Sequence, residues 1–208
     1  MAEHLIGDLP EGWRAVSLAE IGELTAGTAT PATSEEGTVA VAKPKNLVRG
    51  RIAGPPDLID EDEARRLDRY RLVEGDIVCV RTGGLGRHAL MTREQHGWVC
   101  GTGLIRVRLR EEVDHHYLNH YLSHPAVLDW LTRNSVRSPI PSISTTVLGT
   151  LPVALPPPEA QRAIGHALHT LSEKIEAHER IAETTTALRD TLLPLLISGT
   201  VIAPGKEG

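Results

Sequence analysis

The sequence is poor in cysteine and has no long apolar run. Among its 208 residues only Cys79 and Cys100 are cysteines, which is too few for a disulfide framework and gives no metal-ligand spacing. Both lie in apolar, strand-like stretches, so we expect two small core residues. No apolar stretch approaches the roughly 20 residues of a bilayer-spanning helix, and the first residues lack the basic region and apolar stretch of a secretion signal. These features favour a cytoplasmic protein.

The sequence also lacks the common catalytic motifs. The glycine-rich stretch Thr82–Gly86 has no Lys-Ser/Thr pair of the kind that binds nucleotide phosphates and magnesium. The serines between Ser138 and Ser144 stand outside any Gly-x-Ser-x-Gly nucleophile motif. An Asn-Pro-Pro-aromatic tetrapeptide, the motif of adenine methyltransferases, is absent too. We therefore expect a non-catalytic protein without a cofactor of its own.

Three histidines have a spacing that could bind a metal ion. His116, His120 and His124 follow one another at intervals of four, which on an unbroken helix places three imidazoles on one face, as a zinc site would need. No carboxylate or cysteine joins them, and Pro125 disfavours helical geometry at His124. We expect a polar helix face and no metal; a zinc-dependent enzyme is the less favoured alternative.

Charge is distributed unevenly along the chain. The formal net charge is −5, which argues mildly against binding a polyanion. However, the stretch 39–51 contains four basic residues and no acid, and 76–110 contains six arginines against Asp76 and Glu94. Because screening limits charge interactions to roughly 10 Å, one face can be basic on an acidic molecule. The charge pattern permits DNA binding without demonstrating it.

The first part of the chain, to about Leu155, predicts an α+β domain. Short strand-like tracts alternate with loops, and a glycine-rich turn separates two of the tracts. We expect a short helix over 18–24 and a longer one over 114–134, with Asp114 as N-cap and a break at Pro125. The expected sheet is twisted and mostly antiparallel, with strands over 13–18, 38–42, 76–81, 88–92 and 104–109.

Two further expectations concern this first part. Arg106 and Arg108 alternate with apolar residues, so they share one strand face, and we expect that face to be exposed. The proline-rich stretch 138–158 is expected to be irregular and extended.

From Pro158 onward the pattern becomes that of one long helix. Proline suits the first helical position, and Glu159 complements the positive helix end. Apolar residues recur at heptad spacing, and a helix continuing to about Ile197 is roughly 60 Å long. Such a helix needs a partner along its stripe, or else folds back on its own domain. The expected partner-binding residues are Ile164, Leu168, Leu171, Ile175, Ile181 and Leu188.

Several segments resemble the specificity subunit of type I restriction-modification systems. LPEGWRAVSLAEIGELTAG at 9–27 resembles the start of its target-recognition domain, and KNLVRGRI and EGDIVCVRTGGLGRHAL (74–90) resemble later segments. PSISTTVLGTLPVALPPPEAQRAIGHALHTLSEKIEAHERI (141–181) resembles the exit from that domain into a long spacer helix, and LLPLLISGTV resembles the C-terminus. The similarity runs in the expected order through nearly the whole chain.

This resemblance implies a fold and a set of partners. It implies a mixed, antiparallel-sheet target-recognition domain over 1–155, a spacer helix over 156–198 that pairs as an antiparallel coiled coil, and a flexible tail over 199–208. A full subunit carries two such domains and two helices, so we expect a half-length form that works as a homodimer or with a second half-subunit on a bipartite, palindromic target. The implied partners are double-stranded DNA, an adenine-N6 methyltransferase that binds S-adenosylmethionine, and, in some systems, an ATP-dependent restriction subunit.

Residues that could contact DNA are those whose side chains bind phosphates or base edges. For each of them a solvated loop residue is the simpler interpretation. A non-reading adaptor that binds the methyltransferase or another phage-defence protein stays an alternative function, which the net acidity favours slightly. The candidates are Lys43, Lys45, Asn46, Arg81, Thr82, Arg87, Arg133, Asn134 and Arg137.

Overall fold

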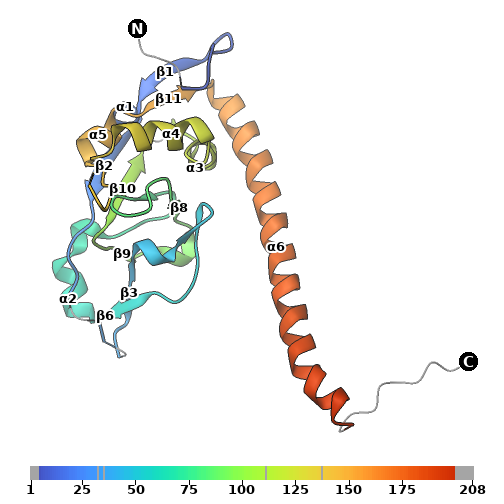
Figure 1. Cartoon of the computed structure of the whole chain (residues 1–208). Coiled ribbons are helices and arrows are strands. Elements are labelled where there is room, and N and C mark those ends of the chain that lie inside the picture. The colour runs from blue at the N-terminus through green and yellow to red at the C-terminus, as the bar shows by residue number, and fades with distance from the viewer. Residues whose placement is uncertain (1–4, 32, 35, 111, 137, 200–208) are drawn as a thin grey trace, which may run out of the picture. The chain divides into compact units, whose positions relative to one another are not determined.

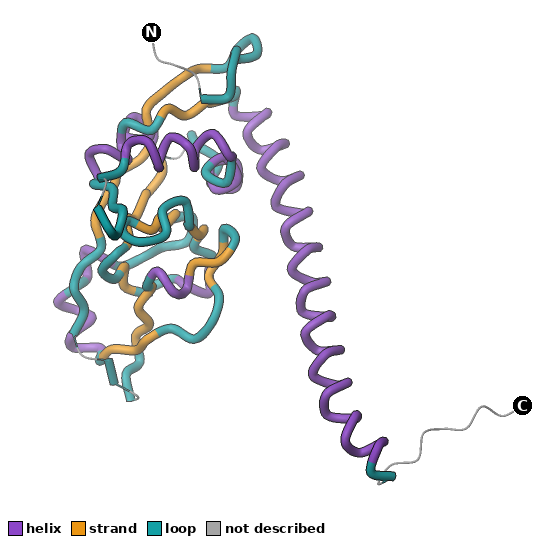
Figure 2. The backbone as a smooth tube through the Cα atoms, viewed as in Figure 1, coloured by secondary structure: helices purple, strands orange, loops and turns teal. Residues whose placement is uncertain are grey.

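A computed structural model describes residues 5–199 except 32, 35, 111 and 137. The chain divides into two compact units, Met1–His166 and Ala167–Gly208. Figures 1 and 2 show the course of the chain and its secondary structure.

The first unit is built on a four-stranded antiparallel sheet. Its strand order is β2 (Gly22–Ala26), β10 (Leu104–Leu109), β7 (Ile77–Val80) and β8 (His88–Leu90). Side chains alternate between the two sheet faces, so Ile105 joins one hydrophobic cluster while Leu104 joins a second. The predicted strand over 104–109 is confirmed, and so is the burial of the two cysteines.

Three smaller sheets surround the central one. The first pairs β1 (Arg14–Ser17) with β11 (Pro152–Leu155), antiparallel. The second has the order β6 (Asp57–Ile59), β3 (Val39–Ala42), β9 (Val99–Cys100); β3 runs antiparallel to β6 and parallel to β9. The third is the hairpin of β4 (Leu47–Val48) and β5 (Arg51–Ile52). The predicted mixed, mostly antiparallel α+β fold is therefore confirmed.

Five short helices complete this unit: α1 (Leu18–Ile21), α2 (Glu61–Arg66), α3 (His115–Tyr121), α4 (Pro125–Asn134) and α5 (Thr145–Gly149). In Figure 1, α1, α4 and α5 lie near the β1–β11 pair, and α2 lies beside β6 at the other end of the unit. The Asp114 side chain accepts a hydrogen bond from the Tyr117 amide (2.7 Å), and α4 restarts at Pro125, as predicted.

The expectation of an irregular chain over 138–158 was wrong for α5. Ser144 caps this helix by accepting a hydrogen bond from the Val147 amide at 3.1 Å, which is a common use of serine at an N-cap. Leu148 and Leu151 are buried in the core. Tertiary burial of these apolar residues thus stabilises a helix of only five residues that periodicity could not reveal.

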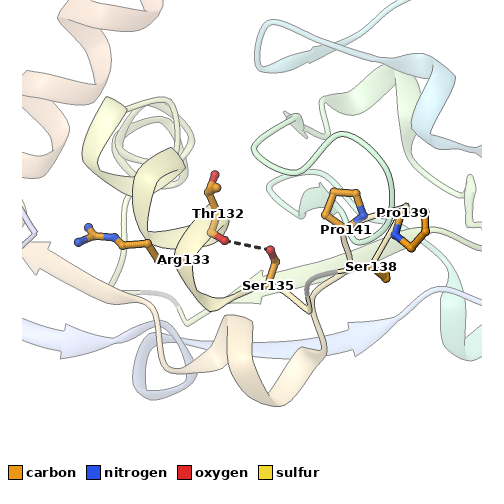
Figure 3. Close-up of a pocket in the computed structure, with 6 residues that line it drawn as sticks. All are labelled: Thr132, Arg133, Ser135, Ser138, Pro139 and Pro141. Atoms are coloured by element: carbon orange, nitrogen blue, oxygen red, sulfur yellow. Dashed lines mark hydrogen bonds between the residues drawn. The ribbon is translucent and has the colours of Figure 1, made fainter.

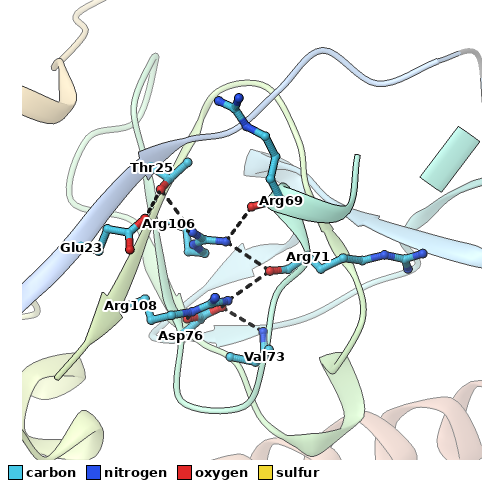
Figure 4. Close-up of polar contacts among 8 residues, drawn as sticks. All are labelled: Glu23, Thr25, Arg69, Arg71, Val73, Asp76, Arg106 and Arg108. Atoms are coloured by element: carbon cyan, nitrogen blue, oxygen red, sulfur yellow. Dashed lines mark hydrogen bonds and ion pairs between the residues drawn. The ribbon is translucent and has the colours of Figure 1, made fainter. Parts of the chain in front are cut away.

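The expectation that Arg106 and Arg108 form an exposed strand face was also wrong. Arg106 is only 5% exposed, because the segment 69–73 covers this face of β10 (Figure 4). The Arg106 guanidinium donates to the carbonyls of Arg69 (3.1 Å) and Arg71 (3.3 Å) and to Thr25 Oγ1 (3.2 Å). Carbonyl groups of the 69–73 segment thus accept the hydrogen bonds that we expected these arginines to make with water.

The long helix α6 (Pro158–Ile197) has the bounds that the sequence predicts. Its first turns belong to the first unit. Buried Gln161 accepts from the Asp114 amide (3.0 Å) and donates to the Pro156 carbonyl (2.9 Å), and Ile164 packs against the core. Ile164 therefore differs from the other predicted partner-binding residues, because its own domain already covers part of it.

The described part of the second unit consists of the remainder of α6 alone. Five apolar side chains expected along its stripe are between 39% and 61% exposed. A single helix cannot bury its own side chains. Within the described residues, no helix has the length and hydropathy required of a membrane span. The exposed residues of the stripe are Leu168, Leu171, Ile175, Ile181 and Leu188.

Candidate nucleic-acid interface

The loop Thr82–Gly86 between β7 and β8, which we call the glycine loop, is covered by three side chains. A Cβ atom added to Gly83 would lie 3.3 Å from Ile140 Cγ2, and a Cβ atom added to Gly84 would lie 2.9 Å from the Arg87 guanidinium. A Cβ atom added to Gly86 would lie 2.6 Å from Leu128 Cδ1. All three glycines also have positive φ, which other residues rarely adopt. The glycines therefore allow α4, the loop after α4 and the neighbouring Arg87 to approach one backbone.

The glycine loop brings the predicted DNA-contacting segments together. Arg87 Nη1 donates to the Pro44 carbonyl (3.2 Å), which joins the loop to the 43–46 segment. On the other side, the Gly83 amide donates to the Pro141 carbonyl (3.0 Å) and the Ile143 amide to the Arg81 carbonyl (2.9 Å). Three segments that lie far apart in the sequence are thus in direct contact.

The lysines of the 43–46 segment are held by a carboxylate. Lys43 Nζ lies 2.6 Å from Asp57 Oδ2, and Lys45 forms an ion pair with the other oxygen. Hydrogen bonds from Lys43 and then Lys45 hold the pKa of Asp57 below its usual range. Two cations share one anion, so this group keeps a net charge of +1.

The side chain of Asn46 stabilises the backbone of this segment. It is only 1% exposed, and its amide accepts from the Lys43 amide and donates to the Pro55 carbonyl, both at 3.1 Å. A contact with adenine, the role expected from the sequence, would require the segment to open first. The other amide, Asn134, is exposed and donates to the Trp130 carbonyl (2.9 Å).

The C-terminal end of α4 forms the far side of the surface. Figure 3 shows a pocket with Thr132 and Ser135 on one side and Pro139 and Pro141 on the other, while the Arg133 side chain points away from the prolines. Ser135 Oγ donates to the Thr132 carbonyl at 3.0 Å. Arg81, Thr82, Arg87 and Arg133 are all exposed. Arg137 lies outside the described residues.

The sequence did not single out His88, whose buried ring contacts the backbone of the glycine loop. The ring is buried, with Nδ1 2.9 Å from the Gly86 carbonyl and Nε2 2.9 Å from the Asn119 carbonyl and 3.2 Å from Ser123 Oγ. Burial lowers the pKa of His88. A single histidine in a strand carries no sequence signal for such a role.

The three histidines considered as a zinc site do not form one helix face. His124 lies outside α3 and instead caps α4, where Nδ1 accepts from the Ala126 amide at 3.2 Å. In the part of the chain that the structure describes, no group of three or more histidine, cysteine, aspartate or glutamate residues is placed to hold a metal ion.

The described residues thus combine a domain of short sheets, exposed basic side chains around the glycine loop and a long helix with an apolar stripe. The family model described as the type I restriction modification DNA specificity domain matches residues 10–186. The chain therefore belongs to this family, as the sequence resemblance predicted. The expectation of a recognition component rather than an enzyme agrees with this membership.

Solved structures share the fold. A chain of a type I R-M system, described for its complex assembly and conformational transition, has a TM-score of 0.66 at 21% identity. The type I S subunit from M. genitalium has 0.66 at 17%, and the HsdS subunit from Thermoanaerobacter tengcongensis has 0.59 at 21%. They align with 89%, 92% and 84% of this chain, which in turn covers 45%, 47% and 40% of theirs. This chain thus spans less than half their length.

Proposed function

We propose that this chain reads a DNA sequence through the surface around the glycine loop and directs an adenine-N6 methyltransferase to it. The main observation in support of this proposal is that Arg81, Arg87 and the segment after α4 converge on one backbone loop. Neither 77–93 nor 130–158 contains an acidic residue. Phosphate contacts by such cations position a protein on DNA, and base contacts then give it specificity.

The second element of the proposal is pairing through α6. We propose that residues 1–155 form the recognition domain and that 156–198 form a spacer helix whose apolar stripe packs against a second copy of this chain. Leu168, Leu171 and Ile175 recur at heptad spacing. Two copies would also match the length of the related solved chains, of which this chain covers 40–47%.

A homodimer has consequences for the target. Identical domains related by a two-fold axis read identical half-sites in opposite orientation, so the site is a palindrome divided by a spacer. The methyltransferase would supply S-adenosylmethionine and the chemistry of methyl transfer. An ATP-dependent restriction subunit joins the complex in systems that also cleave DNA.

DNA binding can be tested with charge-reversed variants. The triple variant Arg81→Glu, Arg87→Glu, Arg133→Glu should bind target duplex roughly 100-fold more weakly in a gel-shift titration, because it replaces three phosphate- or guanine-binding groups with anions. The matched control reverses Arg65 and Arg66, which lie exposed on α2. An adaptor that does not read DNA would retain its activity in the triple variant, and that result would refute the proposal.

A further inference from the structure

Exposed aliphatic side chains gather around the glycine loop. In the described part of the first unit, the exposed large aliphatic residues are Val48 (40%), Leu128 (47%), Val136 (63%) and Ile140 (60%). Leu128 lies against Gly86 and Ile140 against Gly83. Val136 belongs to the same loop as Ile140, where its amide donates to the Ser142 carbonyl at 2.9 Å. Val48 lies on β4, directly after the 43–46 segment.

The two side chains on the glycine loop are held in place from several sides. Ile140 stands between Pro139 and Pro141, whose rings restrict the backbone. Ser138 Oγ donates to the Ile140 carbonyl (2.5 Å), and the next carbonyl, of Pro141, accepts from the Gly83 amide (3.0 Å). Leu128 projects from α4, a regular helix. A fixed, exposed apolar group loses little conformational entropy when it binds a partner.

The cationic side chains near Ile140 and Leu128 indicate the chemical class of the partner. Arg87 lies over Gly84, between the positions of the two aliphatic side chains along the loop, and Arg81 directly precedes the loop in the sequence. An apolar surface for another protein needs no such frame of cations, whereas DNA offers both phosphates and apolar groups. The apolar group that DNA presents in the major groove is the C5-methyl of thymine.

We propose that Ile140 and Leu128 are specificity-determining residues that contact thymine methyl groups in the half-site. The proposal rests on the proposed DNA-reading function, and it assigns to this surface an apolar reading element in addition to its cations. The half-site should therefore contain at least one thymine that the protein recognises by its methyl group and not only by its hydrogen-bonding edge.

The test replaces each thymine of the target, one at a time, by deoxyuridine, which lacks only the methyl group. The target is first obtained by selecting duplexes from a random library with the full-length chain and its methyltransferase. We expect wild-type protein to lose roughly 4-fold in affinity at one or more positions, since burying one methyl-sized group contributes about 0.8 kcal/mol. Equal affinity for thymine and uracil at every position overturns the proposal.

Variants then assign the effect to residues. Ile140→Ala or Leu128→Ala should bind the thymine target more weakly and lose the response to deoxyuridine at the position that the replaced side chain contacts, while the control Ile197→Ala, at the exposed end of α6, behaves like wild type. If both variants keep the full wild-type response to deoxyuridine, these residues do not read the methyl group and the proposal is wrong. If wild-type protein selects no sequence at all, the proposed function itself fails, which is a separate outcome.

Discussion

Arg108 and Asp76 form a two-point ion pair inside the first unit. Arg108 donates from Nε to one oxygen of Asp76 and from Nη2 to the other, both at 2.8 Å, and the Asp76 side chain is completely buried. Hydrogen bonding to Asp76 raises the pKa of Arg108. Asp76 also accepts from the Val73 amide at 2.9 Å, so this pair fixes the 69–73 segment across β10 (Figure 4).

Removing the carboxylate should therefore destabilise the domain. We expect Asp76→Ala to lower the free energy of unfolding by about 2 kcal/mol, because it removes the charge-assisted hydrogen bonds that the buried carboxylate accepts from Arg108 and from the Val73 amide. Denaturant unfolding monitored by circular dichroism measures this change. Asp62→Ala, which removes an 88% exposed partner of Arg65, is the control and should cost less than about 0.5 kcal/mol. Equal effects of the two variants would contradict this role of Asp76.

His88 should make the domain sensitive to acid. Burial lowers the folded-state pKa of His88 from its ordinary value of 6.5, so below about that pH the unfolded chain binds more protons than the folded one. Stability is then complete above that value and falls with decreasing pH, by up to about 1.4 kcal/mol per pH unit for one proton. Thermal unfolding of wild type and His88→Gln across pH 5–8 should show a shallower pH dependence in the variant; identical slopes would argue against this assignment.

Gly86 should be required for the shape of the glycine loop. Gly86 and Gly97 have similar φ values, +90° and +85°, but only a Cβ on Gly86 meets another side chain, that of Leu128. We expect both alanine variants to lose about 1–2 kcal/mol of stability from backbone strain, while only Gly86→Ala also weakens DNA binding. The comparison uses unfolding and gel-shift titrations of the two proteins. A Gly97→Ala variant that impaired binding equally would show that the effect is not local to the loop.

The pairing of α6 can be tested by charging its apolar stripe. Leu171 and Ile175 are each 57% exposed, and Leu171→Lys with Ile175→Lys should convert a dimer into a monomer because like charges would meet across the helix pair. Light scattering after size-exclusion chromatography gives the mass directly. Glu173→Lys, on the opposite helix face, should leave the dimer intact. A wild-type protein that is monomeric at every concentration would refute pairing between copies.

The sequence predicted best those elements whose stabilising pattern is local. The alternation of β10 and the long periodic run of α6 gave exact bounds, and the cap at Asp114 and the break at Pro125 follow from neighbouring residues. What failed depended on distant contacts. Arg106 is buried because a segment 35 residues earlier in the chain crosses its strand, with the Arg71 carbonyl accepting from the guanidinium.

In the candidate site, too, residues with a characteristic chemical type could be predicted, whereas roles that depend on distant contacts could not. Residue type was enough to single out Arg81 and Arg87 and the glycines between them, because cations and glycines have recognisable uses. Sequence alone could not show that the Asn46 amide is occupied by hydrogen bonds within the domain. Its partner Pro55 lies outside the 43–46 segment. Nor could it single out Leu128 and Ile140, because an apolar residue in a helix or loop is ordinarily expected to be buried.

We propose that this chain determines where a methyltransferase acts. Mapping N6-methyladenine in cells that contain the methyltransferase, with the wild-type chain, with the Arg81/Arg87/Arg133 charge-reversed chain, and with no chain, tests it most directly. We expect methylation at a single two-part palindromic motif with the wild-type chain and its loss in the other two cases. The same methylated motif in all three would contradict it.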